Sequence, residues 1–309
     1  MAQLLVVALC LLAGLLLRRR PGLPLDATAA ALNTFVIHVP LPALVLRQVS
    51  GLSLGPEVLV PALVPWVVFG VSIGLVLAVS RLFAFPRPLL GALLLVVPLG
   101  NTSFVGLPLT LAWLGPEAVP WALLYDQLGS FLALATWGTW VVATFGEGAG
   151  VAGPPGASKI IRKIVMFPPF VALVTAVGLS LTLSGGLPSV VAEALDLVSK
   201  ALVPAVLVAV GLKWQLRLVA ADAGPLAVAL ALKLVAAPLV AWGALKALGV
   251  HGLHADATVL EAGMGPMLTA CALALGAGLR PSLVAAVAGY GTLASLGSTG
   301  LVRLLLLPV

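Results

Sequence analysis

Long apolar stretches recur along almost the whole of this 309-residue chain, and few charges interrupt them. Hydrophobic residues make up 61% of the sequence and charged residues 8%, whereas a soluble domain has about 45–50% and about 25%. A globule of this composition could not cover its surface with polar groups, which excludes a soluble enzyme, a disordered chain and a fibrous protein. Because the apolar stretches are continuous and do not alternate, they predict an α-helical membrane protein with several spans and not a transmembrane β-barrel.

A membrane span needs about 20 apolar residues, and the apolar stretches of this chain predict ten transmembrane helices. The expected spans are Gln3–Leu17, Ala27–Val49, Val58–Val79, Leu89–Leu114, Val119–Phe145, Ile160–Leu183, Val190–Leu212, Pro225–Leu245, Ala257–Ala277 and Leu283–Leu307. Too few residues remain between these spans for a domain outside the membrane.

Basic residues in the predicted loops indicate the orientation of the chain. Those on one side of the membrane are Arg18, Arg19, Arg20, Arg81, Arg87, Lys159, Arg162, Lys163, Lys213, Arg217 and Arg280. Those on the other side are Arg47, Lys246 and Arg303. Cytoplasmic loops carry the excess of Lys and Arg, so we expect a cell (inner) membrane protein with both termini extracytoplasmic.

The segment Gly146–Ser158 is rich in glycine and proline and divides the chain into two halves. Residues 1–145 then form one five-helix repeat, residues 146–159 a cytoplasmic linker and residues 160–309 a second repeat. An odd number of spans places the two halves in opposite orientations, as in inverted-repeat transporters. A weak internal similarity supports this interpretation, because Leu41–Leu46 in the second span resembles Val203–Val208 in the seventh.

Proline and glycine interrupt two of the predicted spans. The fourth contains Val97–Pro108, in which two prolines and two glycines bracket Asn101, Thr102 and Ser103. The ninth contains Glu261–Pro266, with two glycines, a proline and a carboxylate. Proline removes a backbone donor and clashes with the preceding turn, so both spans are expected to break within the membrane. Paired breaks of this kind indicate a transporter binding site; the alternative is that the prolines only kink two packed helices.

The residues of these breaks resemble a known family. Gly100–Leu109, Leu124–Ser130 and Glu261–Pro266 are similar to segments of the auxin efflux carrier family, which includes bacterial malate and malonate permeases. The resemblance covers nearly the whole chain in span count and spacing. It implies the fold of the bile acid/sodium symporters, in which a panel domain packs on a core domain and spans four and nine cross. Those symporters have a glutamine after the ninth-span methionine that helps to bind a second sodium ion, whereas this chain has Gly265 there.

A substrate anion is expected at the breaks, since half-helix N-termini present free N–H groups and a partial positive charge. The predicted substrate-binding residues are Asn101, Thr102, Pro108, Met264, Gly265 and Pro266.

Acidic residues inside the predicted spans indicate a cation site. Glu261 directly precedes a break, and Asp126 and Ser130 are four residues apart and so share a helical face. The predicted cation ligands are Glu261, Asp126, Ser130, Gln127 and Thr102, although Gln127 lies off that face. A sodium ion would contact Glu261, Asn101 and Asp126, and a proton is the alternative cation.

Other charged residues are expected to have mainly structural roles. Lys233, near the middle of the eighth span, is expected to pair with Glu261 or Asp126, or to bind the anion. Glu193, Asp196 and Lys200 are expected to compensate one another on one face of the seventh span.

The leading prediction is therefore a secondary transporter of a small organic anion of the carboxylate class, working by alternating access and coupled to sodium or protons. An uncoupled uniporter or efflux carrier is the main alternative, because plant auxin carriers are thought to work without sodium. An intramembrane enzyme is a remote alternative, since His-Glu-x-x-His and Gly-x-Gly-Asp motifs are missing. The expected partners are the anion, the cation and the lipid bilayer. No nucleic acid and no cofactor beyond sodium are predicted, and a homodimer is compatible with the sequence.

Overall fold

The computed structural model describes residues 2–53, 55–147, 156–182, 187–214, 216 and 218–307. Within these ranges the regular elements are all helical. The predicted linker at 146–159 lies mostly outside the described residues, so its role stays a prediction.

Five helical segments among the described residues are long and apolar enough to cross a membrane. They are Leu25–Val49, Pro56–Leu82, Pro116–Phe145, Ser189–Lys213 and Ala220–Ala247. A bent pair of helices adds a sixth, and shorter apolar helices cover parts of the first and fourth predicted spans. These lengths establish a polytopic helical membrane protein.

One group of helices packs mainly on itself and is called layer A here. It consists of α1 (Ala2–Arg18), α2 (Leu25–His38), α3 (Pro40–Val49), α10 (Pro168–Thr182), α11 (Ser189–Ser199) and α12 (Leu202–Lys213). In it, α12 packs on α1 and α2, and α3 packs on α10 and α11. Gly14 and Gly211 allow the α1–α12 contact, because a methyl group on either glycine would overlap the backbone of the other helix.

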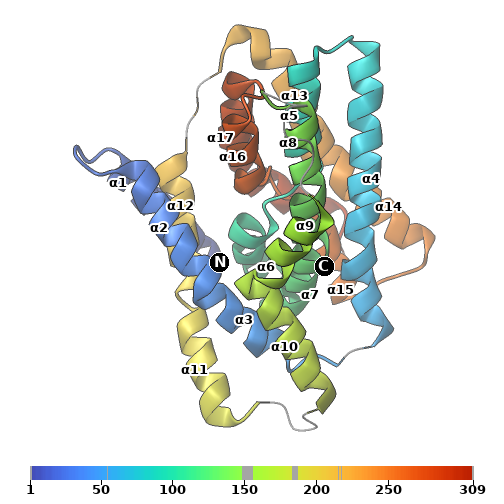
Figure 1. The fold of residues 1–309 in the computed structure, drawn as a ribbon. Helices are drawn as coiled ribbons and strands as arrows, with labels where there is room; N and C mark the ends of the chain where they lie inside the picture. The colour runs from blue at the N-terminus through green and yellow to red at the C-terminus, as the bar shows by residue number, and fades with distance from the viewer. Residues whose placement is uncertain are drawn as a thin grey trace.

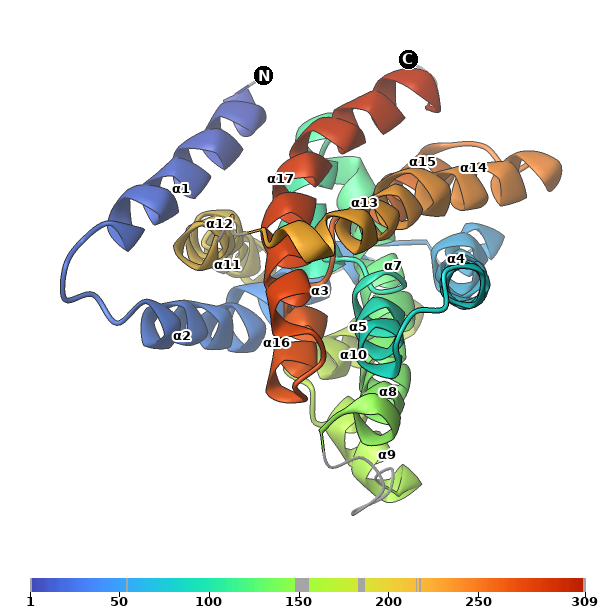
Figure 2. The same cartoon turned by 90° about the horizontal axis from the view of Figure 1, so that it is seen from above.

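The remaining long helices form a second group, called layer B. It consists of α4 (Leu59–Leu82), α5 (Arg87–Val96), α6 (Leu107–Leu114), α7 (Val119–Tyr125), α8 (Thr139–Phe145), α13 (Ala223–Ala231), α14 (Ala237–Ala247), α15 (Leu253–Ala262), α16 (Leu268–Gly276) and α17 (Pro281–Leu305). Here α15 packs on α4, α7 and α14, while α16 packs on α5 and α17. In both views α1, α2, α11 and α12 lie on the left and α4 and α14 on the right (Figure 1, Figure 2).

Four short π-helical segments lie in layer B. They are η2 (Thr102–Gly106), η4 (Asp126–Phe131), η5 (Leu134–Gly138) and η7 (Leu232–Ala236). π-Turns inside helices are frequent at functional sites, and these segments hold several of the predicted site residues. The two layers meet where α6 contacts α1, where α7 contacts α3 and where η2 contacts α12.

The sixth predicted span, Ile160–Leu183, is not one continuous helix. Residues Ala157–Val165 form a separate helix, α9, which is bent by 66° from α10. Pro168 and Pro169 begin a new helix, because proline cannot donate within an existing turn. α9 carries the cations Lys159, Arg162 and Lys163 and is amphipathic. It meets the criteria for a membrane span only together with α10, as a bent pair.

Candidate functional site

The two interrupted spans meet at their breaks. α5 ends at Val96 and α15 ends at Ala262, and the extended residues that follow them pair as an antiparallel bridge between Gly100 and Pro266. The backbone N–H of Asn101 donates to Gly265 O at 2.8 Å, and that of Met267 donates to Leu99 O at 2.9 Å. Each break therefore satisfies backbone groups of the other, as non-helical backbone at membrane depth requires. This junction is called the crossing below.

Helix ends gather around the crossing. The helical turns of η2 continue into α6 on one side, and α16 begins at Leu268 on the other. Two helix N-termini and two helix C-termini consequently lie close to this junction. Such an arrangement offers partial positive and partial negative charge within the same small region.

Asp126 lies next to the crossing and accepts hydrogen bonds on both carboxylate oxygens. Thr102 Oγ1 and Ser103 Oγ donate to Oδ1 at 2.5 and 2.6 Å, and Gln127 Nε2 donates to Oδ2 at 2.6 Å. These bonds tie the first turn of η2 to η4. Ser130 is buried, and no hydrogen bond joins it to Asp126 among the described residues; its predicted role as a cation ligand stays a prediction. Gln127, predicted off that face, nevertheless donates to its neighbour Asp126.

Glu261 occupies the last turn of α15 and is fully buried. Thr110 Oγ1 of α6 donates to its Oε1 at 2.8 Å, while its Oε2 has no hydrogen-bond partner. Gly106 lies directly against this carboxylate, and a Cβ atom at that position would overlap it. Glu261 is thus held between the two interrupted spans with one oxygen left available.

Gly106→Ala is expected to destabilise the protein, because the added methyl group forces the Glu261 carboxylate away from Thr110. Overpacking of a close contact costs about 1–3 kcal/mol, so the thermal unfolding midpoint of the purified variant should fall. Gly74→Ala in α4 is the matched control, since a methyl group there would meet no atom within 4 Å. Equal midpoints for Gly106→Ala and Gly74→Ala would show that Glu261 is free to move aside.

Lys233 does not form the predicted ion pair. Its Nζ lies 3.4 Å from Ala262 O, and no carboxylate oxygen of the described residues comes within 4.0 Å of it. The side chain of Lys233 extends from η7 to the crossing. There its Nζ lies closer to the last carbonyl of α15 than to the carboxylate of Glu261. Sequence spacing could not indicate this, because the contact depends on how α13–α14 packs.

The predicted cluster on α11 is also wrong. Asp196 pairs with Arg47 of α3 at 3.1 Å, so its partner lies on a neighbouring helix and not on its own. Lys200, after the end of α11, is exposed and lines a cavity.

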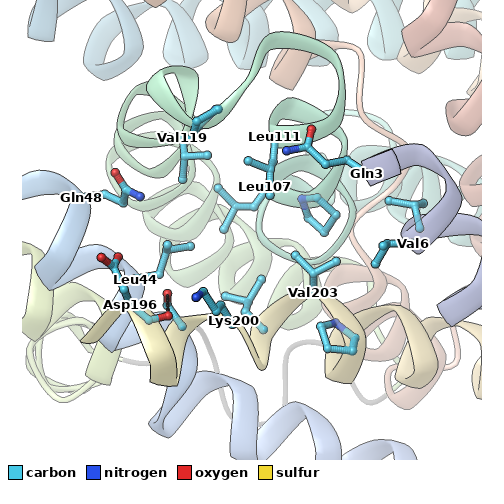
Figure 3. Close-up of a pocket in the computed structure, with 16 residues that line it drawn as sticks. Gln3, Val6, Leu44, Gln48, Leu107, Leu111, Val119, Asp196, Lys200 and Val203 are labelled. Carbon is cyan, nitrogen blue, oxygen red and sulfur yellow. Dashed lines mark hydrogen bonds between the residues drawn. The ribbon is translucent and has the colours of Figure 1, made fainter. Parts of the chain in front are cut away.

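A cavity of about 600 Å³ lies between the layers next to α6, and is called the large cavity. Figure 3 shows Leu107, Leu111 and Val119 facing Val203, with Gln48, Asp196 and Lys200 toward one end. Pro108, a predicted substrate residue, lines this cavity.

A second cavity of about 160 Å³, the small cavity, touches the crossing itself. Asn101, Ser103 and Asp126 supply its polar wall, and Lys163 is its cation. The other lining residues are Ile37, Leu41, Phe104, Phe131, Leu134, Phe167, Met267 and Thr269. Along the α2–α3 span it contacts Ile37 and Leu41, and the large cavity contacts Leu44 and Gln48. The two cavities therefore lie one after the other along the same span.

Three buried polar atoms at or beside the crossing have no hydrogen-bond partner: Asn101 Nδ2, Gln127 Oε1 and Glu261 Oε2. Unpaired buried polar groups are rare in folded proteins and call for an explanation such as a missing ligand. One is a donor and two are acceptors, so the set suits an anion at Asn101 and a cation at Glu261 or Gln127. Within the described part of the chain, no group of three or more His, Cys, Asp or Glu side chains is placed to hold a metal ion.

The remaining predicted substrate residues also lie at the crossing. Met264 is fully buried after the end of α15, Gly265 accepts the Asn101 N–H bond and Pro266 forms the bridge with Gly100. Sequence reasoning left out Ser103 and Thr110, which bond the two acidic residues. The signal for both was a hydroxyl group inside an otherwise apolar stretch.

Comparison with known proteins identifies the class of molecule. The family of membrane transport proteins matches residues 1–302, which is nearly the whole chain. The chain belongs to this family. Membership confirms the predicted auxin efflux carrier resemblance and identifies a membrane transporter, not an enzyme.

Two proteins that are described as transporters are also similar to the chain. An uncharacterized transporter of Methanothermobacter thermautotrophicus is 29% identical over 283 residues, covering 88% of this chain and 87% of its own length. An uncharacterized transporter of Methanocaldococcus jannaschii is 25% identical over 252 residues, covering 79% and 78%. The similarity thus extends over most of each protein.

Proposed function

We propose that this protein carries a small organic anion of the carboxylate class across the membrane by alternating access, with the crossing as its binding site. The observation that carries the proposal is the bridge between Gly100 and Pro266, which joins two interrupted spans beside three unpaired buried polar atoms. Discontinuous helices that meet in mid-membrane are the usual binding site of secondary transporters.

The proposed architecture is ten spans in two inverted five-helix repeats, with layer A as the panel and layer B as the core of a bile acid/sodium symporter-like fold. The breaks after α5 and α15 then occupy corresponding positions in the two repeats. The split of the second and seventh predicted spans, into α2–α3 and α11–α12, is a second feature shared by both halves.

The small cavity favours an anion with a compact apolar body and one carboxylate. Its wall is mostly apolar, and Lys163 is its one basic residue among those described. Asn101 would donate to the carboxylate from beside the N-terminus of η2, where backbone N–H groups add positive potential. The large cavity, on the other side of η2 and α6, would form the opposite half of the transport path.

Glu261 is the proposed position of the coupling cation, either a proton or a sodium ion. Its Oε2 has no partner, and a buried carboxylate is costly unless it is paired, metal-bound or protonated. Asp126, by contrast, is bonded to three donors and is proposed to stabilise the first turn of η2.

The test is uptake of radiolabelled organic acids into liposomes containing the purified protein. We expect accumulation of at least one monocarboxylate or dicarboxylate above protein-free liposomes, with saturation and inhibition by an unlabelled excess. If no acid of a broad set is taken up more than in protein-free liposomes, the proposed substrate class is wrong.

Both termini are proposed to be extracytoplasmic. Arg81 and Arg87 flank the α4–α5 connection and Arg280 precedes α17, and all these connections lie toward the top of Figure 1. A cysteine introduced beside the C-terminus, in a variant without Cys10 and Cys271, should react with a membrane-impermeant thiol reagent in intact cells. Protection of that cysteine, together with labelling of one placed between residues 146 and 158, would reverse the orientation.

A further inference from the structure

Lys233 places its ammonium group at the crossing. The side chain is 3% exposed and belongs to the π-helical segment η7, between α13 and α14. Its Nζ lies 3.4 Å from Ala262 O, the carbonyl of the last residue of α15. It also lies against the other interrupted span, because a Cβ atom on Gly100 would come within 3.0 Å of Nζ. The ammonium group therefore contacts the end of α15 and leaves no room for a side chain at Gly100.

The ammonium group lies in surroundings that would suit a dissolved metal cation such as sodium. The C-terminus of α15 carries a partial negative charge, and the carbonyl of its last residue, Ala262, accepts from Lys233. Glu261, the residue before Ala262, has an oxygen without a hydrogen-bond partner. In transporters with interrupted helices, half-helix C-termini and freed carbonyl groups coordinate the coupling sodium. Here a covalently attached cation already lies at such a helix end.

We propose that the ammonium group of Lys233 is a tethered cation that takes the place of a coupling sodium ion at the crossing. Wild-type protein then has no sodium site there and transports its anion without sodium. This inference rests on the proposed function for the role of the crossing, and deepens it by leaving the proton as the coupling ion at Glu261.

Removal of the lysine side chain should create the missing site. Lys233→Ala leaves a space bordered by Ala262 O, beside the Glu261 carboxylate, and oxygen atoms of this kind suit a hard cation. Sodium should enter this space, and so should methylammonium, which has the charge and the head group of the lost side chain.

Thermal unfolding of the purified protein tests the inference without any knowledge of the substrate. Midpoints are compared in sodium chloride, methylammonium chloride and choline chloride at equal ionic strength. We expect equal midpoints in the three salts for wild type. Lys233→Ala should unfold at a lower temperature in choline chloride and recover part of the loss in the other two salts.

Lys246→Ala is the matched control, because Lys246 lies on the same span and its ammonium group lies over the face of Trp242, at 4.5 Å from the ring centre. It should show no salt-specific shift. Stabilisation of wild type by sodium over choline would overturn the inference, and this result does not depend on any variant being folded. A folded Lys233→Ala, or a folded Lys233→Gln as a second variant, with the same midpoint in all three salts would also overturn it.

Uptake measurements separate this inference from the proposed function. Wild type should take up its anion equally well in sodium and in choline buffers, and Lys233→Ala should lose about tenfold or more of this uptake in choline. Sodium-dependent uptake by wild type would overturn the tethered cation but leave the anion transporter intact. A wild type that transports no organic acid would contradict the proposed function, while the unfolding measurements would still decide whether Lys233 replaces sodium.

Discussion

Asn101→Ala is expected to reduce uptake of the transported anion by about ten- to hundredfold, while the protein still folds and inserts. A hydrogen bond to a charged group contributes about 1.5–3 kcal/mol, and each 1.4 kcal/mol corresponds to about a factor of ten. Asn101 Nδ2 is buried without a partner and lines the small cavity, so its amide is available for the substrate. The backbone N–H of residue 101 still bonds Gly265 O in the variant, which preserves the crossing.

The matched control for this experiment is Asn33→Ala, since these two are the only asparagines in the chain. Asn33 lies on α2, outside both cavities. Initial uptake rates are measured in proteoliposomes with equal amounts of folded protein. Near-normal uptake by Asn101→Ala would remove the crossing as the binding site.

Glu261→Gln is expected to separate anion flux from the cation gradient. The amide has almost the same shape and can still accept the hydrogen bond from Thr110, but it has no negative charge and cannot bind a proton at neutral pH. Uptake by wild type is expected to rise several-fold when a proton gradient is imposed, whereas uptake by Glu261→Gln should be the same with and without that gradient. A sodium gradient is imposed in parallel on both proteins.

Each outcome of this comparison has a defined meaning. If wild type ignores both gradients, the protein is a uniporter and its buried acids are structural. If wild type and Glu261→Gln respond equally, the cation site lies elsewhere and Asp126 is the next candidate. Glu117→Gln, a change of an exposed acid in the α6–α7 connection, should behave as wild type.

Local features of the sequence were sufficient to predict the helical breaks. Pro98 and Pro266 lack the backbone N–H that a helix needs, and Gly100 and Gly263 destabilise a helix through their conformational freedom. The all-helical membrane class followed from composition in the same direct way. Asn101, Gly265 and Pro266 could be assigned to one candidate site because the breaks fall in corresponding spans.

Contacts between distant helices could not be predicted in this way. The partner of Lys233 is the carbonyl of Ala262 and not a carboxylate, because η7 approaches α15 at its backbone end. Arg47 and Asp196 pair across two helices of layer A, whereas sequence spacing favoured partners on one helix. The bend between α9 and α10 was missed because an apolar stretch continues through it, although Pro168 and Pro169 mark the position.

Substrate protection of a single cysteine at position 103 tests the binding site most directly. Ser103 lines the small cavity beside Asn101, and Ser103→Cys is made in a variant that carries Cys10→Ala and Cys271→Ala. The rate of reaction with a small soluble thiol reagent is measured in membrane vesicles with and without a saturating concentration of the transported anion. The proposed site predicts that the anion slows labelling of Cys at 103 several-fold but leaves labelling of a cysteine at exposed Ser158 unchanged. Equal labelling rates at position 103 with and without the anion would contradict binding at the crossing.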